Sequence, residues 1–223
     1  MTEMYRIGSR VAVWHGGDMP ESPEDLYARV VDQVGASGRL PMSAVGEWDV
    51  FPWEVVDGAL APKVLRPPLD AEPPRKGDPG GEPCPTCAGG GEGTRIWEND
   101  RWAVRPFHRA GMPLVLFLEP REHLDLTDLD DDLAAEYGRL SVWLCRIMSN
   151  LPYVGRVHVL RVGDGVAHLH AWFVARPERL PGILGSMAIE WDDMLPPPPE
   201  DVWHADLKTV ADRLATHDGR ALV

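Results

Sequence analysis

Cysteine is scarce in this sequence of 223 residues. Only Cys84, Cys87 and Cys145 are present, which is too few for the disulfide framework of a small secreted domain. The fold must therefore depend on a buried apolar core. A chain of this length with 44% hydrophobic residues is large enough to form one.

Long apolar runs and positive charge are also lacking. No run approaches the ~20 apolar residues that cross a bilayer, and residues 1–6 lack the apolar core of a signal peptide. We therefore predict a cytoplasmic protein that does not enter the membrane. The formal net charge of −13 argues against a general nucleic-acid surface or an anionic-membrane surface, because both require a basic field.

Proline and glycine, in contrast, are abundant and gather in one stretch. Residues 66–83 are almost entirely proline, glycine and charged residues, a composition typical of an extended connector. We predict that this connector separates an N-terminal lead segment, residues 1–65, from a main domain at 84–204. The last part, residues 205–223, is predicted to form a C-terminal helix.

Five short runs in the main domain are predicted to be β-strands. The third run is continuously apolar from Leu114 to Leu118, so we expect it to be central in a sheet and covered on both faces. The link Gly163-Asp164-Gly165 favours an antiparallel hairpin between the last two strands. The predicted strands are 94–98, 102–107, 113–119, 156–162 and 166–174.

Two helices are predicted near the ends of the chain. The first begins at Ser22, an N-cap serine that precedes a proline and is followed three residues later by Asp25. This helix extends to Gly35. The second follows the proline run at 196–199, which stops the preceding structure, and ends at Gly219.

A longer helix is predicted between the third and fourth strands. Thr127 and Asp130 form a capping pair for it, and apolar side chains then recur at spacings of three and four residues. Three strands, a helix and a hairpin together indicate an α+β fold. The apolar stripe consists of Leu133, Tyr137, Leu140, Leu144, Ile147 and Leu151.

The pair Cys84 and Cys87 is the first candidate site. Two thiolates separated by two residues can reach one tetrahedral metal, and the glycines that follow let the backbone fold beneath it. His123, just after the third strand, and His168, on the fifth, would complete a Cys2His2 site if the sheet brings them together. The alternatives are free thiols in a loop or, since no helix follows directly, less readily a redox pair.

The stretch Val166-Ala167-His168-Leu169-His170-Ala171-Trp172 alternates polar or aromatic residues with apolar ones. In a strand, His168, His170 and Trp172 would share one face. A neutral histidine is a competent nucleophile toward phosphorus when a carbonyl holds one ring nitrogen protonated. Alternatively, His170 is a hydrogen-bonded packing residue and Trp172 an aromatic lid on the core. Candidate phosphate partners by charge are Arg105, Arg121, Arg161 and Arg176.

Four separated pieces occur in the order found in a known family. They are the cysteine pair, Ile96-Trp97-Glu98-Asn99-Asp100, the run from Leu116 to His123, and the histidine stretch up to Arg176. In this respect residues 84 to about 177 resemble the histidine triad superfamily of nucleotide hydrolases and transferases. The resemblance implies a five-stranded antiparallel sheet with one long helix inserted before the last hairpin.

The resemblance also implies roles for individual residues. His170 occupies the position of the middle motif histidine, the nucleophile that attacks the α-phosphorus and forms a nucleotidyl-histidine intermediate. Zinc-bearing members, including the galactose-1-phosphate uridylyltransferases, hold a structural metal at the positions of Cys84, Cys87, His123 and His168. Three further positions are expected to face substrate, although their residue types depart from the family pattern. They are Trp172 in place of the third motif histidine, Asp164 in place of a glutamine, and Arg105 near the place of a ribose-binding acid.

We therefore expect a zinc-stabilised hydrolase or nucleotidyltransferase that acts on a nucleotide or other nucleoside phosphate. The resemblance further implies a homodimer. The alternative is a catalytically impaired module of the same fold that binds nucleotides or another protein, with Trp172 filling the pocket of the nucleophile.

Overall fold

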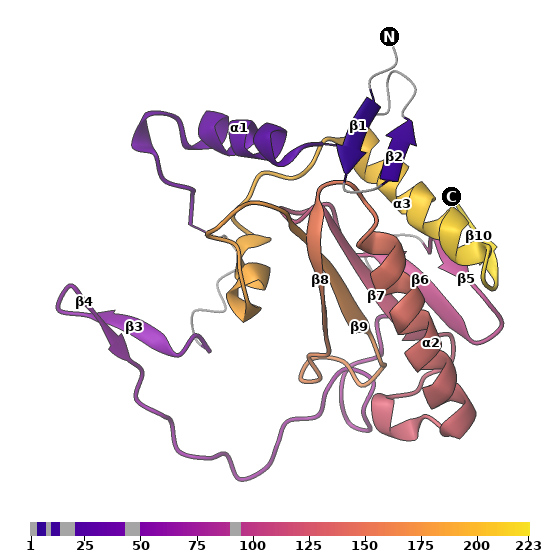
Figure 1. Cartoon of the computed structure of the whole chain (residues 1–223). Helices are drawn as coiled ribbons and strands as arrows, with labels where there is room; N and C mark the ends of the chain where they lie inside the picture. The colour runs from indigo at the N-terminus through magenta and orange to yellow at the C-terminus, as the bar shows by residue number, and fades with distance from the viewer. Residues whose placement is uncertain (1–3, 8–9, 14–20, 43–49, 90–94) are drawn as a thin grey trace.

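A six-stranded antiparallel sheet forms the centre of the computed structural model, which describes residues 4–7, 10–13, 21–42, 50–89 and 95–223 (Figure 1). The α+β class with one long helix is confirmed. The sheet has the order β10-β5-β6-β7-β9-β8, one strand more than predicted. Its members are β5 (Trp97–Glu98), β6 (Trp102–Pro106), β7 (Leu114–Pro120), β8 (Val154–Leu160), β9 (Ala171–Pro177) and β10 (Arg220–Ala221).

The additional strand arises from a turn after the C-terminal helix. Helix α3 (Glu200–Ala215) ends four residues before Gly219, so the predicted helix end was wrong. Gly219 has a φ of +67°, and a Cβ atom there would lie 2.4 Å from the Glu98 carbonyl oxygen. Glycine thus lets the chain turn close against β5, with which β10 then pairs.

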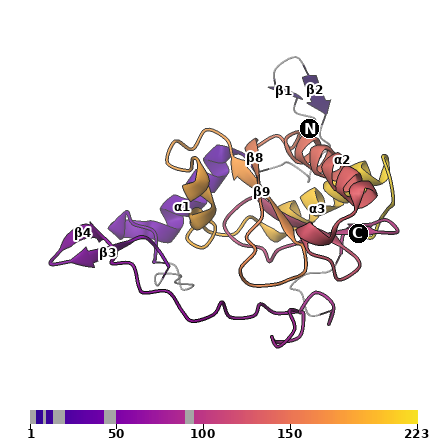
Figure 2. The same ribbon diagram turned by 90° about the horizontal axis from the view of Figure 1, so that it is seen from below.

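Two helices cover one face of the sheet and bury the main apolar core (Figures 1 and 2). They are α2 (Asp131–Met148) and α3, and the strand β7 beneath them is buried along its whole length, as predicted. The N-cap of α2 is Asp130, whose side chain accepts a hydrogen bond from the Leu133 amide. The predicted role of Thr127 was wrong, because Thr127 lies in a separate 3-10 turn, η3 (Leu126–Asp128).

The opposite face carries a smaller core that is covered by the N-terminal helix and by residues 180–195. Val115 and Val174 of the sheet pack there against the 3-10 helix η4 (Ser186–Trp191) and its flanks. Helix α1 (Pro23–Val34) adds Val30 to this core, and Figure 2 shows α1 beside the orange loop of this region. The predicted capping box between Ser22 and Asp25 is present.

The rest of the N-terminal part consists of short elements. Two hairpins are formed by β1 (Met4–Ile7) with β2 (Arg10–Val13) and by β3 (Trp53–Val56) with β4 (Ala59–Pro62). A single 3-10 turn, η1 (Gly35–Ser37), follows α1. The β3–β4 hairpin stands apart from the sheet in both views (Figures 1 and 2). Within the described ranges, no helix combines the length and apolar character needed to cross a membrane.

The strand boundaries differ from the prediction at two places. The first predicted strand, 94–98, is reduced to β5, and Thr94 lies outside the described residues. The last predicted strand, 166–174, begins only at Ala171, so ten residues rather than three join β8 to β9. The backbone before Ala171 bonds elsewhere, since the Ala167 amide donates to Lys76 and the Leu169 amide donates to Leu124.

Candidate metal centre and adjacent histidine

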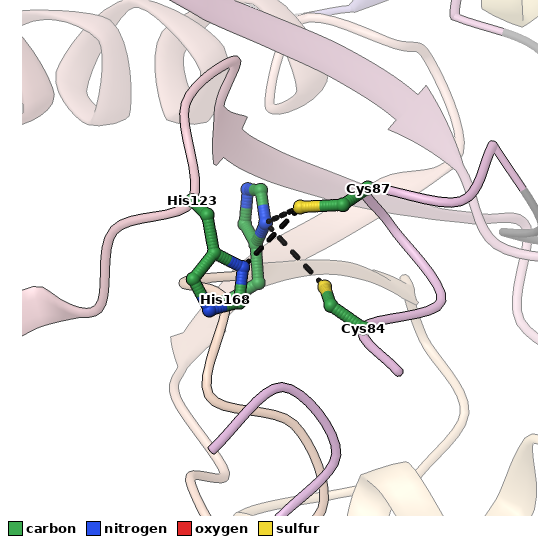
Figure 3. A group of neighbouring side chains, drawn as sticks. All are labelled: Cys84, Cys87, His123 and His168. Atoms are coloured by element: carbon green, nitrogen blue, oxygen red, sulfur yellow. Dashed lines mark hydrogen bonds between the residues drawn. The ribbon is translucent and has the colours of Figure 1, made fainter. Parts of the chain in front are cut away.

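The side chains of Cys84, Cys87, His123 and His168 converge on one point (Figure 3). One ligand atom from each lies within 4.8 Å of the other three. The Cys87 Sγ atom is 3.2 Å from the Nδ1 atom of His123 and 3.4 Å from that of His168. The Cys84 Sγ atom is 3.7 Å from the same His168 nitrogen. The structure therefore brings together all four residues that the spacing suggested.

These separations suit a tetrahedral metal ion. Metal–sulfur bonds of ~2.3 Å and metal–nitrogen bonds of ~2.0 Å place the corners of a tetrahedron about 3.3–3.8 Å apart. The three measured separations, from 3.2 to 3.7 Å, fall close to that range. The cluster is thus spaced as one coordination sphere rather than as a chance grouping of polar side chains.

The topology of the sheet explains why the two histidines meet. Strands β7 and β9 are antiparallel neighbours, and Leu118 pairs with Ala171. The end of β7 and the start of β9 therefore lie side by side, and so do the residues that follow β7 and precede β9. His123 and His168 occupy these two positions, and the Leu169 amide ties the two segments together by donating to the Leu124 carbonyl at 2.8 Å.

A hydrogen bond sets the state of the His168 ring. Its Nε2 atom lies 2.8 Å from the Pro120 carbonyl oxygen, which can only accept, so Nε2 carries the proton. Nδ1 is then unprotonated and faces the thiols. Burial lowers the pKa of His168 and keeps the ring neutral, which is the form that binds metals.

The Cys87 thiol is costly to ionise without a cation beside it. Desolvation, the hydrogen bond with Cys84 and the charge of that neighbouring thiol raise the pKa of Cys87. A metal ion reverses this effect, because it binds thiolates and favours their deprotonated form. Cys87 and His123 are exposed, so an ion can enter from solvent, whereas Cys84 and His168 are buried.

His170 is held differently from His168, although only one residue separates them. The His170 Nδ1 atom lies 2.7 Å from the His168 carbonyl oxygen and must be its donor. Nε2 is then left with a lone pair on a half-buried ring. This arrangement is the one that a nucleophilic histidine requires, and it places His170 directly beside the metal cluster.

Trp172 belongs to an aromatic group next to His170. Its ring centroid lies 4.5 Å from that of Phe117 and 5.2 Å from that of Phe107. Phe117 in turn lies edge-on to His170, with centroids 5.9 Å apart. The Trp172 Nε1 atom is buried without a hydrogen-bond partner among the described residues. One side of His170 is therefore an apolar wall.

The predicted contact Arg105 shares this sheet face but is already paired. Its Nε atom donates to the Glu119 carboxylate at 2.9 Å, and the guanidinium lies 4.4 Å from the centre of the Phe117 ring. Asp164 lies elsewhere: it is exposed in the loop between β8 and β9. There it lines a cleft of about 750 Å³ together with connector residues 72–76, Asp78 and 80–82.

The other candidate phosphate partners also bond to groups of the protein. Arg121 donates to the Asn99 carbonyl, Arg176 to the Pro177 carbonyl, and Arg161 to the Asp125 carboxylate. Sequence reasoning missed Glu119, and it gave no role to the connector that lines the cleft. The only sequence signal for Glu119 was its place at the end of the third strand.

The sheet, the helix before its last strand pair and the four converging ligands define an α+β protein with a candidate metal centre. No protein-family model and no curated protein matches the sequence. Several solved structures are similar to it, and these are histidine triad proteins.

Three of these structures illustrate the similarity. A zinc-bound histidine triad family protein from Mycobacterium smegmatis is 20% identical, with 60% of this chain and 97% of that chain covered and a TM-score of 0.45. A histidine triad protein from Marinobacter aquaeolei is 18% identical over 57% of this chain and 92% of that chain, with a TM-score of 0.47. A hypothetical histidine triad nucleotide-binding protein from Sulfolobus tokodaii is 15% identical over 60% of this chain and 91% of that chain, with a TM-score of 0.44. At this level of similarity, the function has to be inferred from the residues of this chain.

Proposed function

We propose that Cys84, Cys87, His123 and His168 bind a structural zinc ion. Two thiolates and two imidazoles are a donor set that zinc takes in tetrahedral structural sites, with no position left for a substrate. When bound, zinc would cross-link the cysteine loop to the adjoining ends of β7 and β9. Its contribution is to folding free energy, and no chemical step passes through it.

We further propose that His170 is the nucleophile of a nucleotide hydrolase or nucleotidyltransferase. The observation that carries this proposal is the His170 Nδ1 hydrogen bond to the His168 carbonyl at 2.7 Å, which in the neutral tautomer directs the lone pair to Nε2. The Nε2 lone pair attacks the α-phosphorus, an N–P bond forms, and the bond from phosphorus to the leaving group breaks with its electrons. The same carbonyl stabilises the positive charge that the ring then carries.

The second step returns the histidine to its starting state. Water, or an acceptor oxygen in a transferase, attacks the phosphorus and loses a proton. The N–P bond breaks and its electron pair returns to Nε2. The substrate is a nucleotide or nucleoside phosphate, for which we propose Trp172 and Arg105 as contacts. Asp164 lies in a different cleft and is not among them.

The catalytic proposal is tested by comparing three proteins on an adenosine phosphoramidate. The wild type and His204→Ala should release adenosine monophosphate, because His204 is an exposed histidine on α3. His170→Ala should be at least about a thousandfold slower, since loss of a covalent nucleophile is rarely compensated. A phosphorus-linked adduct should be trapped in the first two proteins only. Equal rates in all three, or tight binding without turnover in the wild type, would contradict the proposal.

Metal analysis tests the zinc proposal separately. We expect about one zinc per chain, and we expect Cys84→Ser to weaken zinc binding by a hundredfold or more, because structural sites depend on each ligand. Cys145→Ser is the matched control, since Cys145 lies in α2 and outside the cluster. Wild-type protein whose melting temperature does not change with a chelator would rule out a structural zinc.

Two further proposals concern the whole protein. We propose that it is a homodimer in solution, as the resemblance implies, and that it is cytoplasmic, as its few cysteines favour. Light scattering at micromolar concentration should give twice the 24.7 kDa mass of the chain. A mass equal to that of one chain would contradict the first of these proposals.

A further inference from the structure

Part of the proline- and glycine-rich connector is packed against the candidate metal centre. We call residues 75–82 the strap. The Lys76 amide donates to the Gly165 carbonyl at 3.0 Å, and the Lys76 carbonyl accepts from the Ala167 amide at 2.9 Å. Lys76 thereby forms a parallel bridge with Val166, two residues before His168. The strap thus bonds to the Gly165 carbonyl and the Ala167 amide. The predicted last strand would have needed the Ala167 amide for pairing within the sheet.

Gly77 brings the strap into contact with two of the metal ligands. A Cβ atom at this position would lie 2.7 Å from the His123 Cε1 atom and 3.2 Å from the Cys84 Cβ atom. The first of these distances is too short for real side chains. The φ angle of +94° also favours glycine. Only a residue without a side chain allows the strap to close over the His123 ring in this way.

Charged groups anchor the strap to the segment that follows the same histidine. The Arg75 guanidinium donates to the Asp125 carboxylate at 2.7 Å and to the Asp78 carboxylate at 3.0 Å. Asp125 lies two residues after His123 and is also bonded to Arg161 of the β8–β9 connection. The side chain of Asp125 is only 11% exposed, so this pair is screened less than a surface pair.

We propose that the strap is a positioning element of the metal centre, and that docking of the strap and binding of the metal stabilise one another. At Gly77 the strap lies against both the exposed His123 ring and the Cys84 side chain, so an intact strap pre-organises these ligands. By thermodynamic reciprocity, a bound metal must then strengthen docking of residues 75–82 by the same factor. This inference rests on the proposed metal site.

Alanine substitutions at two glycines of the strap distinguish contact with the metal ligands from backbone strain, because both glycines have a positive φ but only Gly77 lies against the ligands. Gly80 lies in the same strap with a similar φ angle of +85°, but a Cβ atom there would meet nothing within 4 Å. Gly77→Ala should therefore weaken zinc binding about 10- to 100-fold, as loss of a supporting contact does in metal sites. Gly80→Ala should change it by less than about threefold. Competition with a chelator of known affinity measures both.

The outcomes distinguish this inference from the proposal on which it rests. Wild-type protein that binds no zinc overturns both. If the wild type binds zinc but the Gly77→Ala and Gly80→Ala variants lose equal affinity, the positioning role of the strap is wrong and the zinc site stands. An affinity loss confined to Gly77→Ala supports the inference.

Limited digestion of the wild type tests the reciprocal effect without any variant. Trypsin can cut after Lys76 within the strap and after Lys63 outside it. Zinc loading should slow cleavage after Lys76 about tenfold or more relative to chelator-treated protein, because cleavage requires local opening of the strap. Cleavage after Lys63 should stay within about twofold. Equal effects at the two sites, or none at Lys76, would overturn the coupling.

Discussion

His168 and His170 are two residues apart and yet serve different groups. His168 is 1% exposed and directs Nδ1 at the thiols, whereas the half-buried His170 directs Nδ1 back at the His168 carbonyl. The backbone of the proposed metal ligand His168 is thus the hydrogen-bond partner of the proposed nucleophile. Movement of His168 on loss of a metal would be transmitted to the orientation of the His170 ring.

The ion pair of Arg105 with Glu119 yields a prediction about stability. The Glu119 side chain is 2% exposed and that of Arg105 is 12% exposed, so removal of one charge leaves the other poorly solvated. Glu119→Gln should lower the free energy of unfolding by about 2–4 kcal/mol in urea. The exposed helical pair of Lys208 and Asp212 is the control. Its removal should change stability by less than about 0.5 kcal/mol. Similar losses at both pairs would contradict this estimate of the buried pair.

The regular elements were predictable where local chemistry decides them. The capping box at Ser22 and the buried apolar run of β7 needed no knowledge of distant residues. The last strand was predicted to begin five residues too early, because alternation does not show which backbone partners are available. Residues 166–170 bond to the strap and to the turn after β7 instead. That competition depends on tertiary structure and leaves no local pattern.

In the candidate site, too, local sequence patterns could be predicted, whereas contacts that depend on strand register could not. The spacing of Cys84 and Cys87, with histidines near neighbouring strand ends, was enough to suggest the metal cluster. The pairing of Arg105 with Glu119 follows from their meeting across β6 and β7, which depends on strand register. Gly77 was one glycine among many in a connector, and only the folded structure shows that it contacts two ligands.

The contact of α3 with the segment before β8 makes part of the stability depend on pH. The Tyr153 hydroxyl donates to the buried Asp206 carboxyl group. Desolvation by burial raises the pKa of Asp206 to about 6, against the opposing effect of the Tyr153 hydrogen bond. In the unfolded chain the pKa of Asp206 is near 3.8, so the folded state binds this proton more tightly. The resulting contribution to the free energy of unfolding is fully present below pH 3.8 and is lost as pH rises through about 6.

Asp206→Asn should therefore stabilise the protein more at neutral pH than at acidic pH. The amide oxygen can still accept from Tyr153 but does not ionise. The difference in unfolding free energy, variant minus wild type, should grow by roughly 2–3 kcal/mol between pH 4 and 7. Urea titrations across this range measure it. A difference that does not vary with pH would show that Asp206 titrates normally in the folded state.

At the scale of the whole molecule, the N-terminal helix α1 and residues 180–197 meet on the sheet face opposite α2 and α3. The Arg29 guanidinium of α1 donates to the carbonyls of Pro196 and Pro197 at 2.7 and 2.6 Å, and it is also paired with Glu21. Val30 and Trp172 both pack against the small core beneath. The N-terminal helix thus helps to cover the face that carries the aromatic group beside His170.

Arg29 is therefore expected to hold α1 in place. Arg29→Ala removes four hydrogen bonds of a charged donor, two to the carbonyls and two to Glu21. The loss of the two carbonyl bonds should weaken docking of the helix by roughly 1–3 kcal/mol. Amide hydrogen exchange should accelerate about 10- to 100-fold in α1 and along residues 180–196, and remain unchanged in β7. Arg179→Ala is the matched control, because Arg179 also joins the two regions, through Glu24, but both side chains are exposed. If the two variants exchange alike, the carbonyl contacts of Arg29 do not fix the helix, and apolar packing of Leu26 and Val30 must hold it instead.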